Sequence, residues 1–333
     1  ITKAAGDDAF PTIMAAIVSA IDKHGDLMRM AISSPGNDFR LGACEAPPAI
    51  ISTYLGEQLT TFLKEFKEGK TGQTYTPAKA TIDLPYGGKI KVPAEDRNRT
   101  SPFPYGGHRF EFRAAGSSQN VSMINTVLCT IIADSFAYFS SQIEEGKKAT
   151  DVAAEALEKH WKVIFNGNGY SAEWPIEAGE RGVWRIDSGV ESMNVIQQPK
   201  NLELFAKMDV MTEAESKARA EVMFVHYSGI VEIEAKCMVD MIKMNVVPDC
   251  KKAGVAAGDC EAGAGKIEAA LKVMEGTEDE YEKAKLARVL RLETMEEVRA
   301  ACDKAEGLVP PSLWTLGTYK ELLFLDSHQG SSA

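Results

Sequence analysis

The stretch Arg40-Leu-Gly-Ala-Cys-Glu-Ala-Pro-Pro-Ala-Ile50 places a guanidinium and a carboxylate in one loop, bounded by a glycine and by a pair of prolines. Prolines restrict the backbone, so we expect the loop to stay near one shape. A loop of this kind can present the Glu45 carboxylate to a ligand. The alternative is an ordinary surface ion pair between Arg40 and Glu45, since most charged loop residues are solvated.

A second charged stretch, Arg109-Phe-Glu-Phe-Arg113, alternates charged and aromatic residues. This alternation predicts a strand over residues 108–114, with Arg109, Glu111 and Arg113 in a row on one face and the phenylalanines on the other. A carboxylate between two guanidiniums is suited to a metal ion that carries nucleotide phosphates. The alternative is the solvated face of an exposed sheet.

Between these stretches lies Asp96-Arg-Asn-Arg-Thr-Ser-Pro-Phe103. Its two arginines, Arg97 and Arg99, precede Thr and Ser hydroxyls, and guanidiniums hold phosphate oxygens with two parallel hydrogen bonds. The sequence therefore predicts an anion site here, with a solvated basic turn as the alternative.

The composition limits the kinds of partner. The chain has 333 residues, of which 44% are hydrophobic, so we expect two packed units. A net charge of −11 argues against nucleic acid or an anionic membrane as the main partner. No run approaches the roughly 18 uninterrupted apolar residues of a membrane-spanning helix. We expect a soluble compartment, either the cytoplasm or an organelle stroma or matrix. The six cysteines contain no Cys-x-x-Cys pair and are expected to be reduced thiols.

Apolar periodicity predicts most of the secondary structure. Helices are expected over residues 10–30, 50–66, 121–138, 151–165, 202–243 and 279–305. For 202–243 the alternative is a helix that is broken near Tyr227-Ser-Gly229. Residues 67–93 are rich in turn formers and predict an extended loop or hairpin. Asn166-Gly-Asn-Gly169 predicts a turn with positive φ values, and the glycine-rich segment 253–265 predicts a mobile connection.

Taken in order, the three charged motifs resemble the C-terminal part of the catalytic domain of glutamine synthetase, and in particular of its long type III class. Later segments agree with this resemblance, which spans essentially the whole chain: Ile164-Phe-Asn-Gly-Asn-Gly-Tyr-Ser171, Glu232-Ile-Glu-Ala235 and Thr318-Tyr-Lys-Glu-Leu-Leu-Phe324.

The resemblance implies a role for each matching residue. Arg40 and Arg113 match arginines that hold the glutamate substrate and the transferring phosphoryl group. Glu45 matches the acidic loop residue that closes over the glutamate pocket and helps to deprotonate ammonium. Arg99, with Arg97 as its rival, matches the arginine that stabilises the γ-phosphoryl group.

Two further matches concern ATP and its metal. Arg109 matches an ATP-site arginine, and Glu111 matches a ligand of the Mg²⁺ or Mn²⁺ that bridges the ATP phosphates. The implied reaction begins with ATP phosphorylating the glutamate side chain. Ammonia then displaces phosphate from the acyl phosphate.

The resemblance also implies an architecture. Residues 1–145 would belong to the antiparallel sheet or barrel of an α+β catalytic domain with flanking helices, and residues 146–333 to a mainly helical C-terminal region. Family members assemble into homo-oligomers, which for this class implies a double-ring dodecamer. The segments that supply the remaining metal ligands have no match here, so we expect a longer polypeptide. The alternatives are a non-catalytic assembly or regulatory fragment and a related γ-glutamyl-amine ligase.

Overall fold

The structure is a computed structural model that describes residues 8–43, 46–75, 81–91, 96 and 98–324. The chain divides into two compact units, Ile1–Ala220 and Glu221–Ala333. The predicted boundary after residue 145 separates two segments of the family's sequence. It is a different kind of boundary from the division between compact units, and it stays a prediction. Each unit is described by itself.

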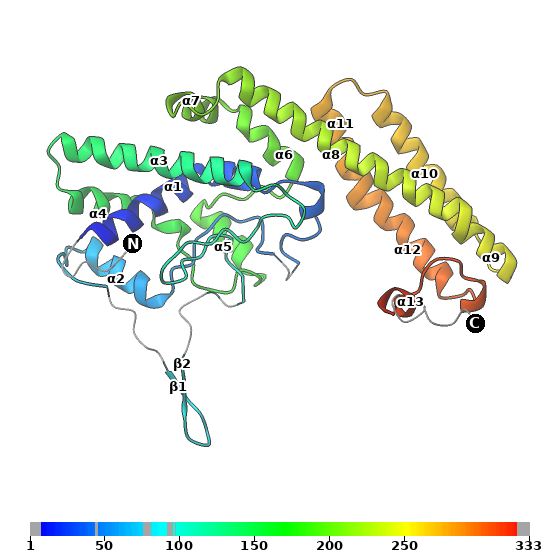
Figure 1. The fold of residues 1–333 in the computed structure, drawn as a ribbon, viewed down its shortest axis with the longest axis horizontal. Coiled ribbons are helices and arrows are strands. Elements are labelled where there is room, and N and C mark those ends of the chain that lie inside the picture. The colour runs from blue at the N-terminus through cyan, green and yellow to red at the C-terminus, as the bar shows by residue number, and fades with distance from the viewer. Residues whose placement is uncertain (1–7, 44–45, 76–80, 92–95, 97, 325–333) are drawn as a thin grey trace, which may run out of the picture. The chain divides into compact units, whose positions relative to one another are not determined.

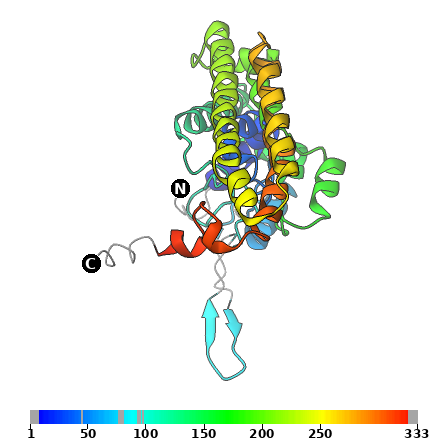
Figure 2. The same ribbon diagram turned by 90° about the vertical axis from the view of Figure 1, so that its right-hand side faces the viewer.

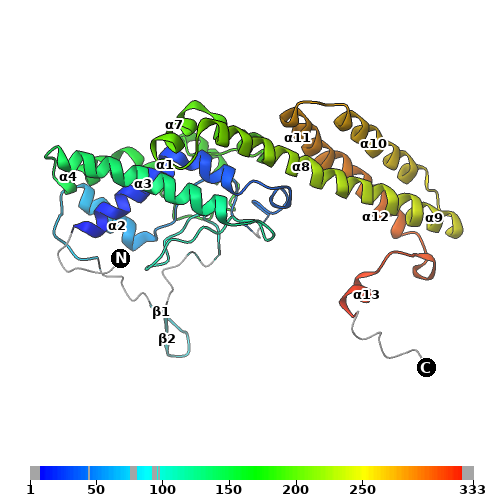
Figure 3. The same cartoon turned by 45° about the horizontal axis from the view of Figure 1, so that its top comes forward.

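Helix α1 (Ala9–Ala31) is the core of the first unit (Figure 3). It lies where the sequence predicts a helix and is buried along most of its length. Helices α3 (Ser122–Glu144), α4 (Ala149–His160) and α6 (Gly189–Asn194) pack against it. Its apolar side chains on all sides therefore identify α1 as a central helix.

Charged side chains of α1 hold the surrounding segments by specific contacts. His160 Nδ1 lies 2.7 Å from Asp22 Oδ2, and Asn201 Nδ2 donates to Asp26 Oδ2 at 2.9 Å. Arg29 Nε donates to a loop carbonyl oxygen at 2.7 Å. All three α1 residues are buried, and buried charges need such partners. Shorter helices complete the unit: α5 (Trp174–Arg181) and α7 (Pro199–Lys207).

Helix α3 is long and apolar enough to cross a membrane by length and composition alone, with a mean hydropathy of 1.3 over its best window. Polar residues interrupt the apolar ones along this helix, so no long uninterrupted apolar run marks this property in the sequence. The core helix of a soluble protein passes the same test, and α3 packs against α1, where Ser135 Oγ donates to the Ala16 carbonyl oxygen at 2.7 Å.

The predicted helix over 50–66 begins later than expected. Helix α2 covers Glu57–Lys67, and residues 50–56 are extended. Thr53 N donates to the Val163 carbonyl oxygen at 2.8 Å, and Ile51 N donates to the Trp184 carbonyl oxygen at 2.9 Å. Backbone partners from distant segments thus replace the first helical turns.

The described residues contain a single two-stranded sheet. Strands β1 (Thr81–Asp83) and β2 (Lys89–Lys91) form an antiparallel hairpin with Ile82 opposite Ile90, which confirms the hairpin predicted within 67–93. The predicted strand over 108–114 is wrong as an element, since only Phe110 forms a bridge, with Tyr105. The antiparallel sheet of the implied catalytic domain is likewise not present in the part of the chain that the structure describes.

The second unit is helical (Figures 1 and 2). Helix α8 crosses the unit boundary and continues through a π-helical turn into α9, and a second π-helical turn joins α11 to α12. These elements and the remaining helices are α8 (Glu213–Met241), its π turn (Ile242–Val246), α9 (Val247–Ala253), α10 (Gly258–Glu275), α11 (Glu280–Val289), its π turn (Leu290–Thr294), α12 (Met295–Glu306) and α13 (Tyr319–Leu323).

Two predictions for this region are wrong. The helix expected over 202–243 is divided between α7 and α8, with Asp209 at a left-handed φ of 53° in the connection. The segment 253–265, expected to be a mobile connection, contains the first turns of α10. A Cβ on Gly263 would lie 2.7 Å from Val298 Cγ1, so the small residue allows α10 and α12 to approach closely.

Candidate active site

The Arg40 side chain is oriented by a buried asparagine. Asn37 ends a 3₁₀ turn (Pro35–Asn37), and its Nδ2 donates to the Ala114 carbonyl oxygen at 2.8 Å. Its Oδ1 accepts a hydrogen bond of 2.9 Å from Arg40 Nη1, which also donates to the Ala115 carbonyl oxygen at 2.7 Å. The half-buried guanidinium is therefore attached to the residues that directly follow Arg113.

The proline-containing loop closes on itself. Gly42 has a φ of +78°, and its N–H donates to the carbonyl oxygens of Ala46 at 3.0 Å and Pro47 at 3.3 Å. The two ends of the loop thus have a defined geometry. Glu45 lies outside the described residues, so its predicted role stays a prediction.

The charged row of the second motif forms although the strand does not. Glu111 Oε1 lies 3.2 Å from Arg113 Nε, and Glu111 Oε2 lies 3.4 Å from Arg109 Nη2. Phe110 stacks on Phe103 at 5.0 Å between ring centroids, on the apolar side of the same segment. The alternation read from the sequence is therefore present in an extended segment that hydrogen-bonds to residues 102–106.

The three charged side chains differ in exposure. The Arg113 side chain is 11% exposed, whereas those of Arg109 and Glu111 are 49% and 44% exposed. Arg113 is therefore the anchored member of the row. The ion pair between Arg109 and Glu111 is close to solvent and is correspondingly weak.

Arg99 stands on a tight turn in the third motif. Its φ is +57°, a left-handed conformation that few residues other than glycine adopt, and its N–H donates to the Asp96 carbonyl oxygen at 3.1 Å. The Arg99 side chain is exposed, and within the described residues it makes no hydrogen bond or ion pair. It is available to a ligand. Arg97, its rival, lies outside the described residues.

A loop from the 164–171 motif covers this turn. Tyr170 Oη donates to the Arg99 carbonyl oxygen at 3.1 Å. A Cβ on Gly169 would lie only 2.2 Å from the Thr100 carbonyl oxygen, so only glycine fits there. The predicted positive φ values are wrong, because neither Gly167 nor Gly169 has one. These glycines are needed for close approach rather than for backbone conformation.

The structure brings Arg40, Arg99 and Arg113 onto hydrogen-bonded neighbouring segments. Residues Asn37 and Asp96, which make these connections, were not predicted from the sequence. Asp96 precedes a turn and so carries a local signal, since Asp side chains accept hydrogen bonds from nearby backbone N–H groups. Asn37 carries no such signal, because its partner Ala114 is distant in sequence.

The described residues do not form a metal centre by themselves. No group of three or more His, Cys, Asp or Glu side chains within them is arranged to hold a metal ion. Glu111 is a single carboxylate with guanidinium neighbours, whereas Mg²⁺ binds several oxygen ligands. Further ligands would have to come from outside the described residues.

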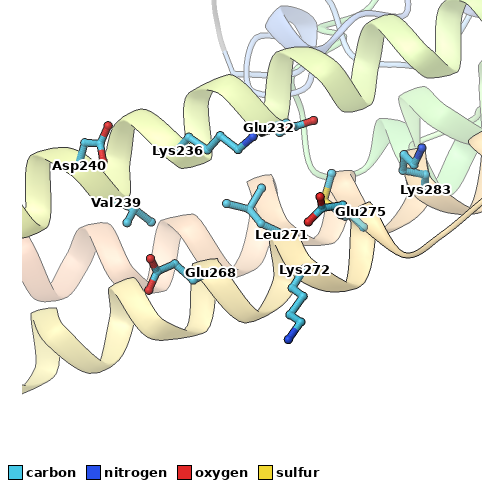
Figure 4. A pocket seen from close by; sticks show the side chains of 10 residues that line it. Glu232, Lys236, Val239, Asp240, Glu268, Leu271, Lys272, Glu275 and Lys283 are labelled. Carbon is cyan, nitrogen blue, oxygen red and sulfur yellow. Dashed lines mark hydrogen bonds and ion pairs between the residues drawn. The ribbon is translucent and has the colours of Figure 1, made fainter.

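The described residues line two cavities, of which only the first touches a charged motif. One of about 210 Å³ lies beside the proline-containing loop and includes Leu41, Gly42 and Pro48 in its lining. A groove of about 580 Å³ lies in the second unit between α8 and α10, with Glu232, Lys236 and Glu268 among its lining residues (Figure 4). The groove contains none of the predicted site residues.

Comparison with known proteins is consistent with the sequence motifs. Residues 148–255 match the family model of the glutamine synthetase C-terminal domain. The type-3 glutamine synthetase of Dictyostelium discoideum is 33% identical over 95% of this chain and 49% of its own length. The glutamine synthetase of Butyrivibrio fibrisolvens is 30% identical over 95% of this chain and 50% of its own length. That of Bacteroides fragilis is 34% identical over 73% of this chain and 35% of its own length. The chain spans about half the length of the first two relatives.

Proposed function

Because this chain belongs to the glutamine synthetase family, we propose that the full-length protein is a ligase that uses ATP to form glutamine from glutamate and ammonia. The reaction passes through a γ-glutamyl phosphate, from which ammonia displaces phosphate. The observation that carries the proposal is the joining of the Arg40, Arg99 and Arg113 segments by hydrogen bonds.

The chemistry of this reaction suits such a cluster. Both the glutamate carboxylates and the transferring phosphoryl group are anions, and guanidiniums bind their oxygens in fixed geometry. Phosphoryl transfer depends mainly on positioning and charge stabilisation. We assign Arg40 and Arg113 to the glutamate substrate, Arg113 and the exposed Arg99 to the phosphoryl group, and Arg109 to ATP.

Two acidic residues complete the proposal. We assign Glu111 as one ligand of a divalent cation, Mg²⁺ or Mn²⁺, with the remaining ligands outside the described residues. We assign Glu45 to ammonium, because a carboxylate attracts a small cation and can accept its proton once water is excluded.

The proposal includes the assembly state and the compartment. We propose a homo-oligomer, by resemblance a double-ring dodecamer, in a soluble compartment. Native mass spectrometry of the full-length protein would report twelve copies if the assembly is correct, and a monomer would contradict it.

Phosphate release by the full-length protein tests the proposed activity. We expect release only when ATP, glutamate, ammonia and a divalent cation are all present, with one glutamine formed for each phosphate. Omitting each component in turn provides the controls. Phosphate release that does not require glutamate would contradict the proposal, as would a product made only from larger amines.

A further inference from the structure

Asp96 connects the Arg99 turn to the rest of the site. Asp96 is a buried residue, and its Oδ2 accepts a hydrogen bond of 2.7 Å from the Ser101 N–H. Thr100 Oγ1 lies 3.5 Å from both carboxylate oxygens. The buried Asp96 carboxylate therefore holds the turn that bears Arg99 in its conformation. Solvent cannot replace the hydrogen bonds of this carboxylate, because it is buried.

The same residue holds Arg113. Arg113 Nη1 donates to the Asp96 carbonyl oxygen at 2.5 Å and lies 3.6 Å from Asp96 Oδ2. Both side chains are almost fully buried, at 11% and 6% exposure, so solvent screens this contact little. Arg113 Nε donates a hydrogen bond to Glu111, whereas Arg113 Nη1 contacts Asp96. Asp96 is therefore the residue that joins Arg113 to the Arg99 turn.

The charge of Asp96 also affects its surroundings. Burial raises the pKa of Tyr54, and the negative charges of Asp96 and Glu57 raise it further. Replacing the carboxylate by an amide would keep a hydrogen-bond acceptor for Ser101 but remove the charge opposite Arg113.

We propose that Asp96 is a positioning residue that fixes the Arg99 turn and the Arg113 guanidinium relative to each other. The inference rests on the proposed function, in which these two arginines act on the transferring phosphoryl group. Donors that stabilise a transition state must be fixed in advance, and small displacements of such donors lower kcat strongly. Loss of the Asp96 charge should therefore affect turnover more than ATP binding.

The test uses Asp96→Asn and Asp96→Glu in the full-length protein, with Asp249→Asn as the matched control. Asp249 is also buried, accepts a backbone N–H at 2.7 Å from Thr315 and has a cation, Lys252, at 3.5 Å. It lies in the second unit, among none of the proposed site residues. We expect Asp96→Asn to lower kcat about 10- to 100-fold while KM for ATP changes less than about threefold. Asp96→Glu should recover part of kcat because it keeps the charge.

The possible outcomes separate the two proposals. A wild-type protein that forms no glutamine overturns the proposed function itself. An active wild type in which Asp96→Asn and Asp249→Asn lose activity equally, in proportion to their folded fractions, overturns the positioning role alone. If Asp96→Asn does not fold, Asp96→Glu decides: a kcat no lower than that of the wild type, per folded protein, would contradict the inference.

Discussion

At the residue scale, local sequence predicts the charged side chains of the site. It does not predict the residues that hold these side chains in place. The alternation in 109–113 gives the row Arg109, Glu111 and Arg113 without knowledge of any partner. The hydrogen bonds of Asn37 to Ala114 and of Asp96 to Arg113 connect residues far apart in sequence, and periodicity has no information about such contacts. The sequence therefore predicts which residues carry the charges of the site, but it does not predict which residues orient those side chains.

Gly169 provides a prediction at this scale. Gly169→Ala would place Cβ 2.2 Å from the Thr100 carbonyl oxygen, a backbone atom that cannot rotate away. We expect the free energy of unfolding to fall by about 1–3 kcal/mol, the usual cost of overpacking, and the Arg99 turn to shift. Chemical denaturation measures the first effect. Gly179→Ala in α5 is the control, because no atom lies within 4 Å of its Cβ position. Equal stability of the two variants would contradict the close approach.

His24 provides a second prediction. Burial lowers its pKa below the ordinary value of 6.5, with Lys200 contributing, while Asp134 at 3.5 Å and Asp26 oppose the shift. The unfolded chain then binds a proton more readily than the folded protein as the pH falls through 6.5. The stability that neutral His24 supports is present above this pH and is lost below it.

Melting temperatures of wild type and His24→Gln between pH 8 and pH 5 check this sign. The wild type should lose more stability than the variant over that range, because glutamine does not titrate. A wild type that gains stability relative to the variant on acidification would show that the Asp134 contact outweighs the burial.

At the element scale, helices were predicted well where apolar periodicity is strong and poorly where another contact decides. Helix α2 begins at Glu57 because residues 50–56 find backbone partners elsewhere. The first turns of α10 resemble a loop in sequence, since Gly263 and Gly265 have low helix propensity. Packing overrides that propensity at one of these glycines, because Gly263 contacts Val298 of α12.

These two glycines form a matched pair for the third prediction. Gly263→Ala should destabilise the protein by about 1–3 kcal/mol through the clash with Val298. Gly265→Ala, in the same helix but with no atom within 4 Å of its Cβ position, should stabilise it by about 0.5–1 kcal/mol. Urea denaturation of both variants checks the opposite signs. Adding Val298→Ala should reduce the cost of Gly263→Ala, and the absence of this coupling would contradict the assigned contact.

At the scale of the whole molecule, length alone predicts two packed units, and the chain divides into two compact units between Ala220 and Glu221. The position of the division could not be predicted, because α8 runs through it as one helix and neither glycine nor proline occurs between Glu213 and Ser228. The implied sheet of the catalytic domain is absent from the described residues, because the alternating segment 108–114 pairs with another segment only through the bridge of Phe110 to Tyr105. An alternating pattern predicts which side chains share a face, but it carries no information on whether a partner strand lies beside the segment.

The two π turns give the second unit two places that tolerate a change in chain length. Each turn, Ile242–Val246 and Leu290–Thr294, accommodates one residue more than a regular α-helix would. Deleting a single amino acid there would restore ordinary helical winding and leave the downstream helix in place, whereas a deletion in a regular stretch would rotate that helix by about 100° around its axis. Related sequences should therefore tolerate one-residue gaps at these two turns more readily than elsewhere in the same helices.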